Sequence, residues 1–124
     1  MRYLLDTHIL LWARSAPERL SEDVLAILKS ADNDFYVSVV TLWECAIKSA
    51  IGKLEIPVGF HRIVADDYHL LGVEIPHLEA YANLPLHHRD PFDRMLIVQA
   101  QSSGLILLTK ESNFARYDVP IILN

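Results

Sequence analysis

Four carboxylates in this chain lie where they could act together on a metal ion. Each follows a short apolar segment or stands in the first turns of an apolar helix; they are Asp6, Glu44, Asp93 and Glu111. Carboxylates brought close together repel one another unless a cation lies between them, and oxygen-only ligands suit Mg²⁺ or Mn²⁺. Such an ion lowers the pKa of a bound water molecule and holds a phosphodiester for in-line attack. The residue types therefore indicate metal-dependent hydrolysis, provided that the fold gathers them.

Three of these acids also have a purely structural interpretation. Asp6 could be the N-cap of the helix that follows it, because aspartate is among the best capping residues. In HRDPFD, Asp90 reads as an N-cap followed by Pro91, which makes Asp93 a first-turn acid that favours the helix dipole. Glu111 could be a first-turn acid of a short helix. Taken singly, each acid is weak evidence of a site.

Glu44 is harder to explain by structure alone. The spacing Thr41-x-x-Glu44 fits a capping box. Apolar residues nevertheless share its helix face and also line the opposite side, so the helix is predicted to be buried nearly all round. An ionised carboxylate in such surroundings needs a partner or a metal. The sequence leaves both interpretations of Glu44 open.

The elements that must position these acids alternate between strand and helix. Short strands are predicted at 2–5, 35–38, 72–75, 105–108 and 120–124. Helices are predicted at 7–14, 21–30, 40–50, 60–70, 77–84 and 91–103. This alternation predicts an α/β fold with a mainly parallel sheet that helices cover on both faces. Since sites in such folds form at the carboxyl ends of the strands, the four acids are expected at one edge.

Length and composition narrow the class of protein. The 124 residues, 52% of them hydrophobic, fit a single folded domain spanning 1–124. No apolar run reaches the ~20 residues of a membrane span, and Asp6 interrupts the N-terminal apolar run before a signal peptide could form. A net charge of −5 argues against binding nucleic acid through bulk positive charge. It does not exclude a nucleic-acid enzyme with a metal-filled acidic centre.

Other reactive residue types are predicted to be structural. Cys45 is the only cysteine, so no internal disulfide is possible; we expect a buried thiol in a protein of the reducing cytoplasm. His87 and His88 are adjacent and lack cysteine or histidine partners at zinc-binding spacing, so they read as loop residues. The chain has no glycine-rich phosphate loop.

Four segments together resemble a PIN domain, and within that group the VapC-like toxin ribonucleases of bacterial toxin–antitoxin pairs. The segments are LLDTHILLW (4–12), SVVTLWECAIKSAIGKL (38–54), HRDPFDRMLIVQAQ (88–101) and LILLTKESNFARYDV (105–119). They cover most of the chain in the family's order and spacing, so the resemblance is strongly specific.

The resemblance implies a three-layer α/β/α sandwich with a short, mainly parallel sheet, and an endoribonuclease that depends on Mg²⁺ or Mn²⁺. It assigns catalysis and metal binding to Asp6, Glu44 and Asp93. The family usually shows Thr-x-Asp near the last strands, where this chain has a glutamate, and Glu111 is therefore the candidate fourth metal ligand.

The implied partners are an RNA substrate and a cognate antitoxin protein. Thr7 matches the small hydroxyl residue that follows the family's first acid. Arg89, Arg94 and Lys110 flank the acids in the sequence and are candidates to hold phosphates. Apolar residues expected to be exposed, such as Leu84 and Leu86, leave room for a homodimer.

Two other classes of protein remain as alternatives. A phosphoacceptor domain would have paired acids at the end of the first strand and a lysine after the last, whereas here Asp6 is followed by Thr7 and Lys110 precedes a glutamate. A non-catalytic α/β domain could use the acidic edge as a metal-dependent binding site. A phosphatase with an Asp-x-Asp nucleophile is disfavoured because the sequence reads DTH at 6–8.

Overall fold

The computed structural model describes the whole chain, Met1–Asn124, as alternating strands and helices around one sheet. The strands are β1 (Arg2–Leu5), β2 (Asp34–Ser38), β3 (His69–Leu71), β4 (Ile106–Thr109) and β5 (Ile121–Leu123). The α-helices are α1 (Thr7–Ser15), α2 (Glu22–Lys29), α3 (Val39–Ala50), α4 (Phe60–Asp67), α5 (Ile75–Ala82) and α6 (Pro91–Ser103). Two short 3₁₀ helices, η1 (Pro17–Arg19) and η2 (Ser112–Arg116), complete the chain.

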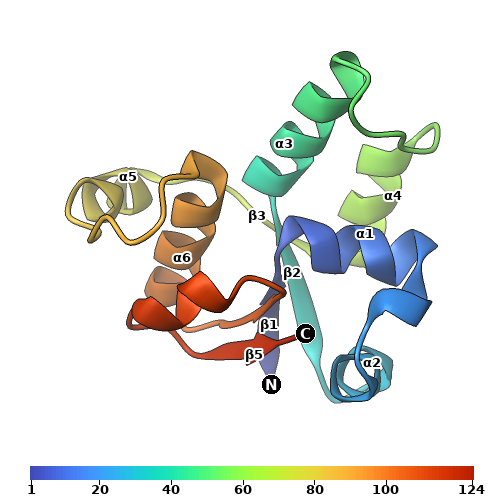
Figure 1. Ribbon diagram of the computed structural model, residues 1–124, viewed down its shortest axis with the longest axis horizontal. Coiled ribbons are helices and arrows are strands. Elements are labelled where there is room, and N and C mark those ends of the chain that lie inside the picture. Colours follow the sequence, from blue (N-terminus) through green and yellow to red (C-terminus); the bar gives the residue numbers. More distant parts are fainter.

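The five strands form one sheet in the order β3-β2-β1-β4-β5, and every neighbouring pair is parallel. β1 lies at the centre, where Leu4 is opposite Tyr36 of β2 and Leu107 of β4. Figure 1 shows the sheet between two helical layers, with α5 and α6 on one side and α1, α2 and α4 on the other. The predicted three-layer α/β/α sandwich with a parallel sheet is confirmed.

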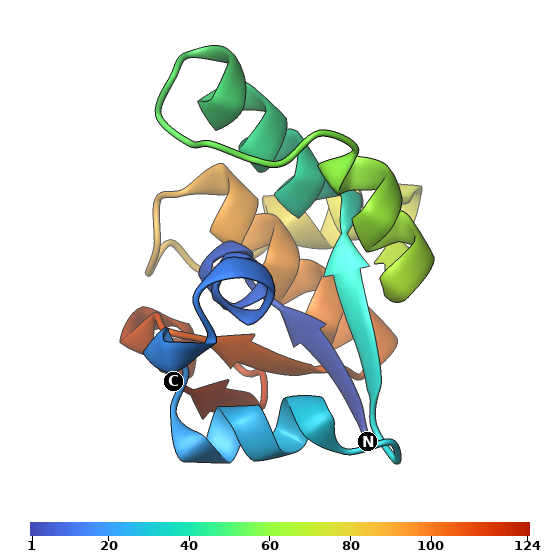
Figure 2. The ribbon, with the colours of Figure 1, turned by 90° about the vertical axis from the view of Figure 1, so that its right-hand side faces the viewer.

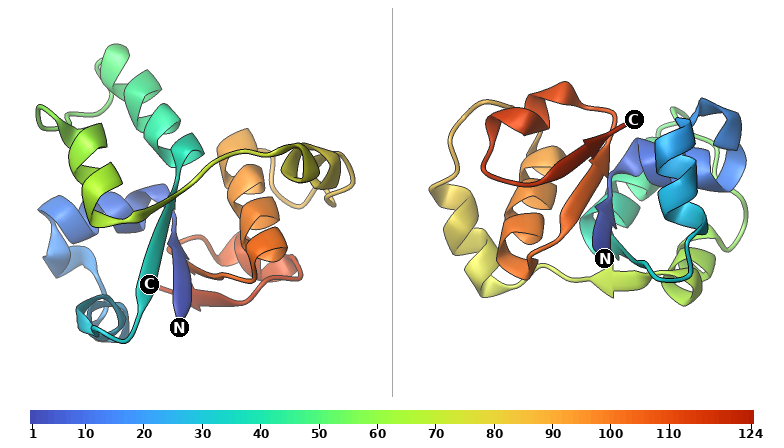
Figure 3. Two further views of the ribbon diagram at one scale, coloured as in Figure 1. Left: turned by 180° about the vertical axis from the view of Figure 1, so that it is seen from behind. Right: turned by 90° about the horizontal axis from the view of Figure 1, so that it is seen from below.

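Successive residues of β1 point alternately into two hydrophobic cores, one on each face of the sheet. Leu4 is fully buried among residues of α6, β4 and η2. Tyr3 and Leu5 point the other way, into a second cluster built from α1, α2, α3 and α4. This alternation follows from the two-residue period of a strand, and it explains why β1 reads as an unbroken apolar run. The view from below in Figure 3 shows the sheet dividing the two helical groups.

The parallel topology brings the start of α6 to the same edge as the ends of the strands. Asp90 caps α6 by accepting hydrogen bonds from the backbone N–H groups of Phe92 (2.8 Å) and Asp93 (3.2 Å), and Pro91 is the first helical residue. The helix ends at Gly104, whose φ of 64° is left-handed, and the chain then enters β4. A helix that leads into a parallel strand runs opposite to it, so α6 begins at the carboxyl edge. The predicted cap and the predicted helix 91–103 are confirmed.

The region around residue 72 differs from the prediction. No strand forms at 72–75: α4 ends at Asp67, and His69–Leu71 pair with β2 as the edge strand β3. Helix α5 begins at Ile75, two residues earlier than predicted, because the Glu74 backbone N–H donates to Nδ1 of the buried His77 (3.0 Å). Figure 2 shows β2 running up to α3, beside α4, at the carboxyl edge of the sheet.

None of the six α-helices combines the length and the hydropathy that crossing a membrane requires. Cys45 is a free, buried thiol, as expected, and burial raises its pKa to about 11.

Candidate active site

Asp6 is held at the junction between β1 and α1. One carboxylate oxygen caps α1 by accepting the N–H of Ile9 (3.0 Å), as the structural interpretation predicted. The other oxygen accepts the hydroxyl of Thr109, at the end of the neighbouring strand β4 (2.5 Å). The side chain is 2% exposed, and burial raises its pKa despite these hydrogen bonds. Capping therefore explains only one of the two oxygens of Asp6.

Glu44 does not belong to a capping box. Helix α3 begins at Val39, and its N-cap is Ser38, whose hydroxyl accepts the N–H of Val40 (3.1 Å). The hydroxyl of Thr41 makes no hydrogen bond at all. The capping-box interpretation of Glu44 is wrong because α3 starts at Val39, three residues before the first helical residue that an N-cap at Thr41 would give. Glu44 thus lies in the second turn of α3, where its carboxylate is not needed to cap the N-terminus of the helix.

The carboxylate of Glu44 is instead buried against two donors from the site itself. It accepts the hydroxyl of Thr7 at Oε1 (2.6 Å) and pairs with the ammonium of Lys48 at Oε2 (2.8 Å). Only 6% of the residue is exposed. The expectation that a buried glutamate needs a partner is met, and the bond from Thr7 joins α3 to the start of α1 beside Asp6.

Burial and the charges of the other acids change the pKa of Asp93. Its pKa is raised to about 8, first by burial and then by the negative charges of Asp90, Asp6, Glu44 and Glu111. Its Oδ2 lies 3.1 Å from Nε2 of His88. The structure therefore places the acids that the sequence singled out at one edge of the sheet, within electrostatic range of one another.

The acids do not form a ready-made metal cluster. No three His, Cys, Asp or Glu side chains lie in positions that would hold a metal ion. The hydrogen bonds explain this, since Asp6 is engaged by Thr109 and the start of α1 while Glu44 is engaged by Thr7 and Lys48. Glu111 is the most loosely held of the four acids: it is partly exposed, and its nearest cation, Lys110, is 4.0 Å away.

Two of the four candidate substrate-binding residues have structural roles instead. Thr7 is 5% exposed and its hydroxyl proton is committed to Glu44. Arg94 is 7% exposed, and its guanidinium donates to the carbonyl oxygens of Leu84 (3.1 Å) and Pro85 (2.9 Å) while lying over the ring of Tyr81. A guanidinium used in this way fastens the loop before α6 and is unavailable to a phosphate. The assignment of Thr7 and Arg94 to substrate binding is therefore corrected.

The other two candidates are available to a ligand. Arg89 is exposed on the loop that leads into α6. Lys110 is exposed after β4, with its ammonium 5.8 Å from the ring centre of Trp12. Both cations flank the acidic edge and remain candidates to hold phosphates.

Sequence reasoning missed three side chains that hold the acids. Lys48 stands four residues after Glu44, a spacing at which helical side chains of opposite charge pair, so it could have been found. Thr109 could not, because it meets Asp6 across 103 residues. His88 was assigned to a loop, which is correct, but its Nδ1 accepts the N–H of Asp90 (3.1 Å) and its Nε2 thereby faces Asp93.

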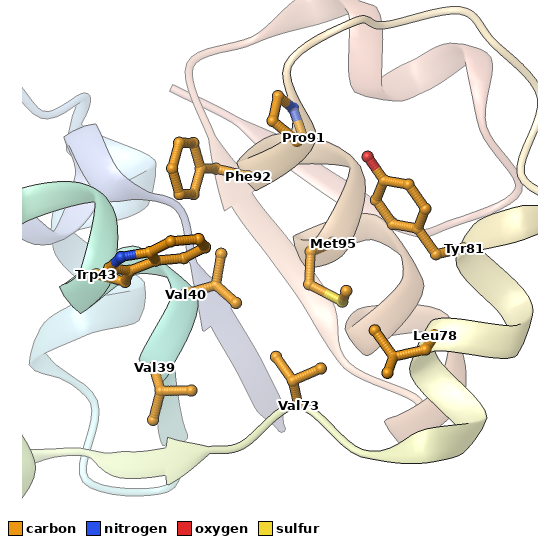
Figure 4. A pocket seen from close by; sticks show the side chains of 9 residues that line it. All are labelled: Val39, Val40, Trp43, Val73, Leu78, Tyr81, Pro91, Phe92 and Met95. Atoms are coloured by element: carbon orange, nitrogen blue, oxygen red, sulfur yellow. The ribbon is translucent and has the colours of Figure 1, made fainter. Parts of the chain in front are cut away.

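An apolar pocket of about 640 Å³ adjoins the acidic edge. Its walls come from α3, α5 and the start of α6, as Figure 4 shows, and consist of Val39, Val40, Trp43, Val73, Leu78, Tyr81, Pro91, Phe92 and Met95. Trp43 is 62% exposed and meets the edge of the Phe92 ring, with ring centres 5.4 Å apart. Trp43 directly precedes Glu44 in the sequence, and Phe92 directly precedes Asp93. The apolar pocket and the acidic edge are therefore adjacent.

Comparisons with known proteins identify the same fold along the whole chain. A model of the PIN domain family matches residues 3–120. The chain is similar to a chain of VapBC2 from Rickettsia felis, solved bound to a DNA fragment from their promoter, with a TM-score of 0.77 and 15% identity over 100% of this chain and 99% of that one. Among curated proteins, no sequence match was found.

Two further solved structures are similar to this chain. A chain of FitAcB from Neisseria gonorrhoeae gives a TM-score of 0.70 at 20% identity, covering 100% of this chain and 97% of that one. A chain of VapBC-1 from nontypeable Haemophilus influenzae gives a TM-score of 0.70 at 18% identity, covering 99% of this chain and 98% of that one. Identities this low establish a common fold and leave the activity of this chain to its own residues.

The raised pKa of Asp93 predicts how stability depends on pH. The folded protein holds the Asp93 proton up to about pH 8, whereas the unfolded chain releases it near pH ~4. The stabilising contribution is therefore complete below about pH 4 and is lost as the pH rises to about 8. In EDTA, the free energy of unfolding of the wild type should fall relative to that of Asp93→Asn across this interval, as measured by urea denaturation.

The exposed Asp118 provides the matched control. Asp118→Asn should keep the pH profile of the wild type. Parallel profiles for wild type and Asp93→Asn would show that Asp93 ionises normally, contrary to this prediction.

Proposed function

Since the chain belongs to the PIN domain family, as its match over residues 3–120 establishes, we propose that it is a metal-dependent endoribonuclease and the toxin of a toxin–antitoxin pair. The observation that carries the proposal is the convergence of Asp6, Glu44 and Asp93 from three separate elements on one edge. The pKa of Asp93 is raised by burial first, and then by the charges of Asp90, Asp6, Glu44 and Glu111. The choice of RNA as substrate rests on the family resemblance. A cytoplasmic location is proposed because the chain has a single cysteine, which suits a reducing compartment.

The residues of the edge fit Mg²⁺ or Mn²⁺. They offer carboxylate oxygens, the ligands that these ions prefer, and their mutual repulsion is the state that a divalent cation relieves. Asp6, Glu44 and Asp93 would hold the ion, and Glu111 could join them because it is less constrained than the others. When bound, the ion would supply an activated water molecule and charge stabilisation for phosphodiester hydrolysis.

The other residues of the edge orient the acids and receive the substrate. The hydroxyls of Thr109 and Thr7 fix the rotamers of Asp6 and Glu44, as partners of metal ligands commonly do. His88 does the same for Asp93. The exposed Arg89 and Lys110 would hold phosphates on either side of the scissile bond.

The alternatives are less consistent with this geometry. A phosphoacceptor aspartate must present a free oxygen to its phosphodonor, but Asp6 is 2% exposed and both of its oxygens accept hydrogen bonds. A non-catalytic role for the edge would not require the buried pairing of Glu44 with Thr7, which costs the desolvation of a carboxylate.

Cleavage assays test the nuclease. Single-stranded RNA should be cut in Mg²⁺ or Mn²⁺, leaving 5′-phosphate ends, and EDTA should abolish the cut. Glu44→Gln and Asp93→Asn should each lose more than about a hundredfold in rate, beyond the loss typical of a residue behind a metal ligand. In EDTA at neutral pH, the melting temperature should stay close to that of the wild type for Glu44→Gln and should be higher for Asp93→Asn, as the raised pKa of Asp93 predicts.

Glu79→Gln is the control, because it makes the same change at an exposed position of α5. It should cleave at the rate of the wild type. Undiminished cleavage in EDTA, or a fully active Glu44→Gln variant, would contradict the proposed site.

The antitoxin is the second proposed partner. An acidic edge attracts a basic side chain, and a cation from a bound protein segment could take the place of the metal's charge. Similar folds in a toxin–antitoxin complex from Klebsiella pneumoniae and in a VapBC toxin–antitoxin system from Mycobacterium tuberculosis support this assignment.

Co-expression with the product of the neighbouring reading frame tests the partner. The two proteins should co-purify with the nuclease inhibited, and replacing the partner's Arg or Lys residues by Ala one at a time should restore cleavage at one of them. A stable complex that cleaves RNA at the rate of the free protein would refute this mode of inhibition.

A homodimer would use the apolar pocket. Trp43, Leu78 and the neighbouring Ile75 are exposed on α3 and α5, and a second copy would remove this surface from water. Leu86 is also exposed, at 70%, on the loop before α6. Leu84 was expected to be exposed as well, but it is partly buried because it packs against the core beneath α6.

Sedimentation equilibrium tests the dimer. Trp43→Glu should weaken self-association by more than about tenfold, since tryptophans are frequent hot spots of interfaces. Val58→Glu introduces the same charge at a fully exposed position outside the pocket and should leave self-association unchanged. A wild-type protein that remains monomeric at high concentration would exclude the homodimer.

A further inference from the structure

Lys48 contacts a candidate metal ligand directly. Its ammonium lies 2.8 Å from Oε2 of Glu44, one turn earlier on α3. The two side chains differ in exposure, at 41% for Lys48 and 8% for Glu44. The carboxylate is therefore fixed inside the protein, whereas the lysine reaches it from solvent along a flexible stem.

The charges around Lys48 place its ammonium among the acids. Its pKa is raised, first by the hydrogen bond to Glu44, and the negative charges of Glu44 and Asp90 add to the rise against the cost of burial. The positive charges of Lys110 and Lys48 in turn help burial to lower the pKa of His8, which follows Asp6 and Thr7 on α1. Lys48 thus faces side chains of α1, α3 and the N-cap of α6, the elements that form the acidic edge.

We infer that Lys48 is an exchangeable internal counter-ion, which neutralises Glu44 in the metal-free protein and must leave when a divalent cation binds. This inference rests on the proposed function, because it assumes that Glu44 is a metal ligand. In the metal-free protein Lys48 occupies one of the two Glu44 oxygens that the ion would need. Lys48 is a positioning residue that acts through Glu44.

The exchange has two consequences that a purely structural ion pair lacks. Removing the ammonium should weaken the metal-free protein, because Glu44 would remain buried without its cation. The same change should strengthen metal binding, because the ion would no longer displace a competitor. A lysine that only stabilised α3 would lower stability equally with and without metal.

Binding of Mn²⁺ to the intact protein, measured by calorimetry, tests the inference. Lys48→Met should bind Mn²⁺ about two- to fivefold more tightly than the wild type, the factor expected when a partly exposed ion pair no longer competes. Its melting temperature in EDTA should be lower than that of the wild type, and the rise on adding saturating Mn²⁺ should be larger. Lys48→Gln, which keeps a hydrogen-bond donor without the charge, should bind Mn²⁺ more tightly as well.

Two variants separate this effect from general electrostatics. Lys48→Arg keeps the positive charge and should bind Mn²⁺ as the wild type does. Lys53→Met removes the same charge from an exposed position after the end of α3 and should also leave the affinity unchanged. If Lys53→Met raised the affinity as much as Lys48→Met, net charge would be the cause and the inference would be overturned.

The outcomes distinguish this inference from the proposed function. Wild-type protein that binds Mn²⁺ and cleaves RNA, together with an unchanged affinity in Lys48→Met, would overturn the exchange alone. Wild-type protein that neither binds Mn²⁺ nor cleaves RNA would overturn the metal site and the exchange together.

Discussion

Repulsion between carboxylates at the carboxyl edge of the sheet is the constraint on which the surrounding structure depends. Each acid is partly buried, where like charges interact more strongly than in water. Hydrogen-bond donors offset this repulsion. The hydroxyl of Thr109 donates to Asp6, and the hydroxyl of Thr7 and the ammonium of Lys48 donate to Glu44. Lys48 lies on the same helix as Glu44, whereas Thr109 and Thr7 reach Asp6 and Glu44 from other elements. The order of the edge therefore depends on the complete sheet.

The sheet and its edge could be predicted because their signals are local. Short apolar runs predicted β1 and β4, and Asp90 followed by Pro91 predicted the start of α6. The convergence of Asp6, Glu44 and Asp93 then followed from topology, because the carboxyl ends of parallel strands and the starts of crossover helices share one edge. No contact between side chains had to be known for this step.

The failures occurred where contacts distant in sequence decide the outcome. The pairing of His69–Leu71 with β2 sets the edge strand, and nothing in the residues at 69–75 distinguishes this register from one shifted by three positions. Arg94 reads as a surface cation, and only the fold reveals the carbonyl groups of Leu84 and Pro85 that bury it. Glu44 was assigned a capping alternative because the spacing Thr41-x-x-Glu44 fits a capping box, and only the structure identifies Ser38 as the cap.

The hydrogen bond between Thr109 and Asp6 has a consequence for the order in which the protein is made. Asp6 leaves the ribosome 103 residues before its partner Thr109. The central strand β1 can pair with β2 early in synthesis but must wait for β4 on its other side, and chains emerge from the N-terminus at only ~5–20 residues per second. A nascent chain therefore carries the first acid for several seconds without the strand that orients it. Until β4 has followed, the carboxylate of Asp6 has only the donor from the start of α1 to orient it.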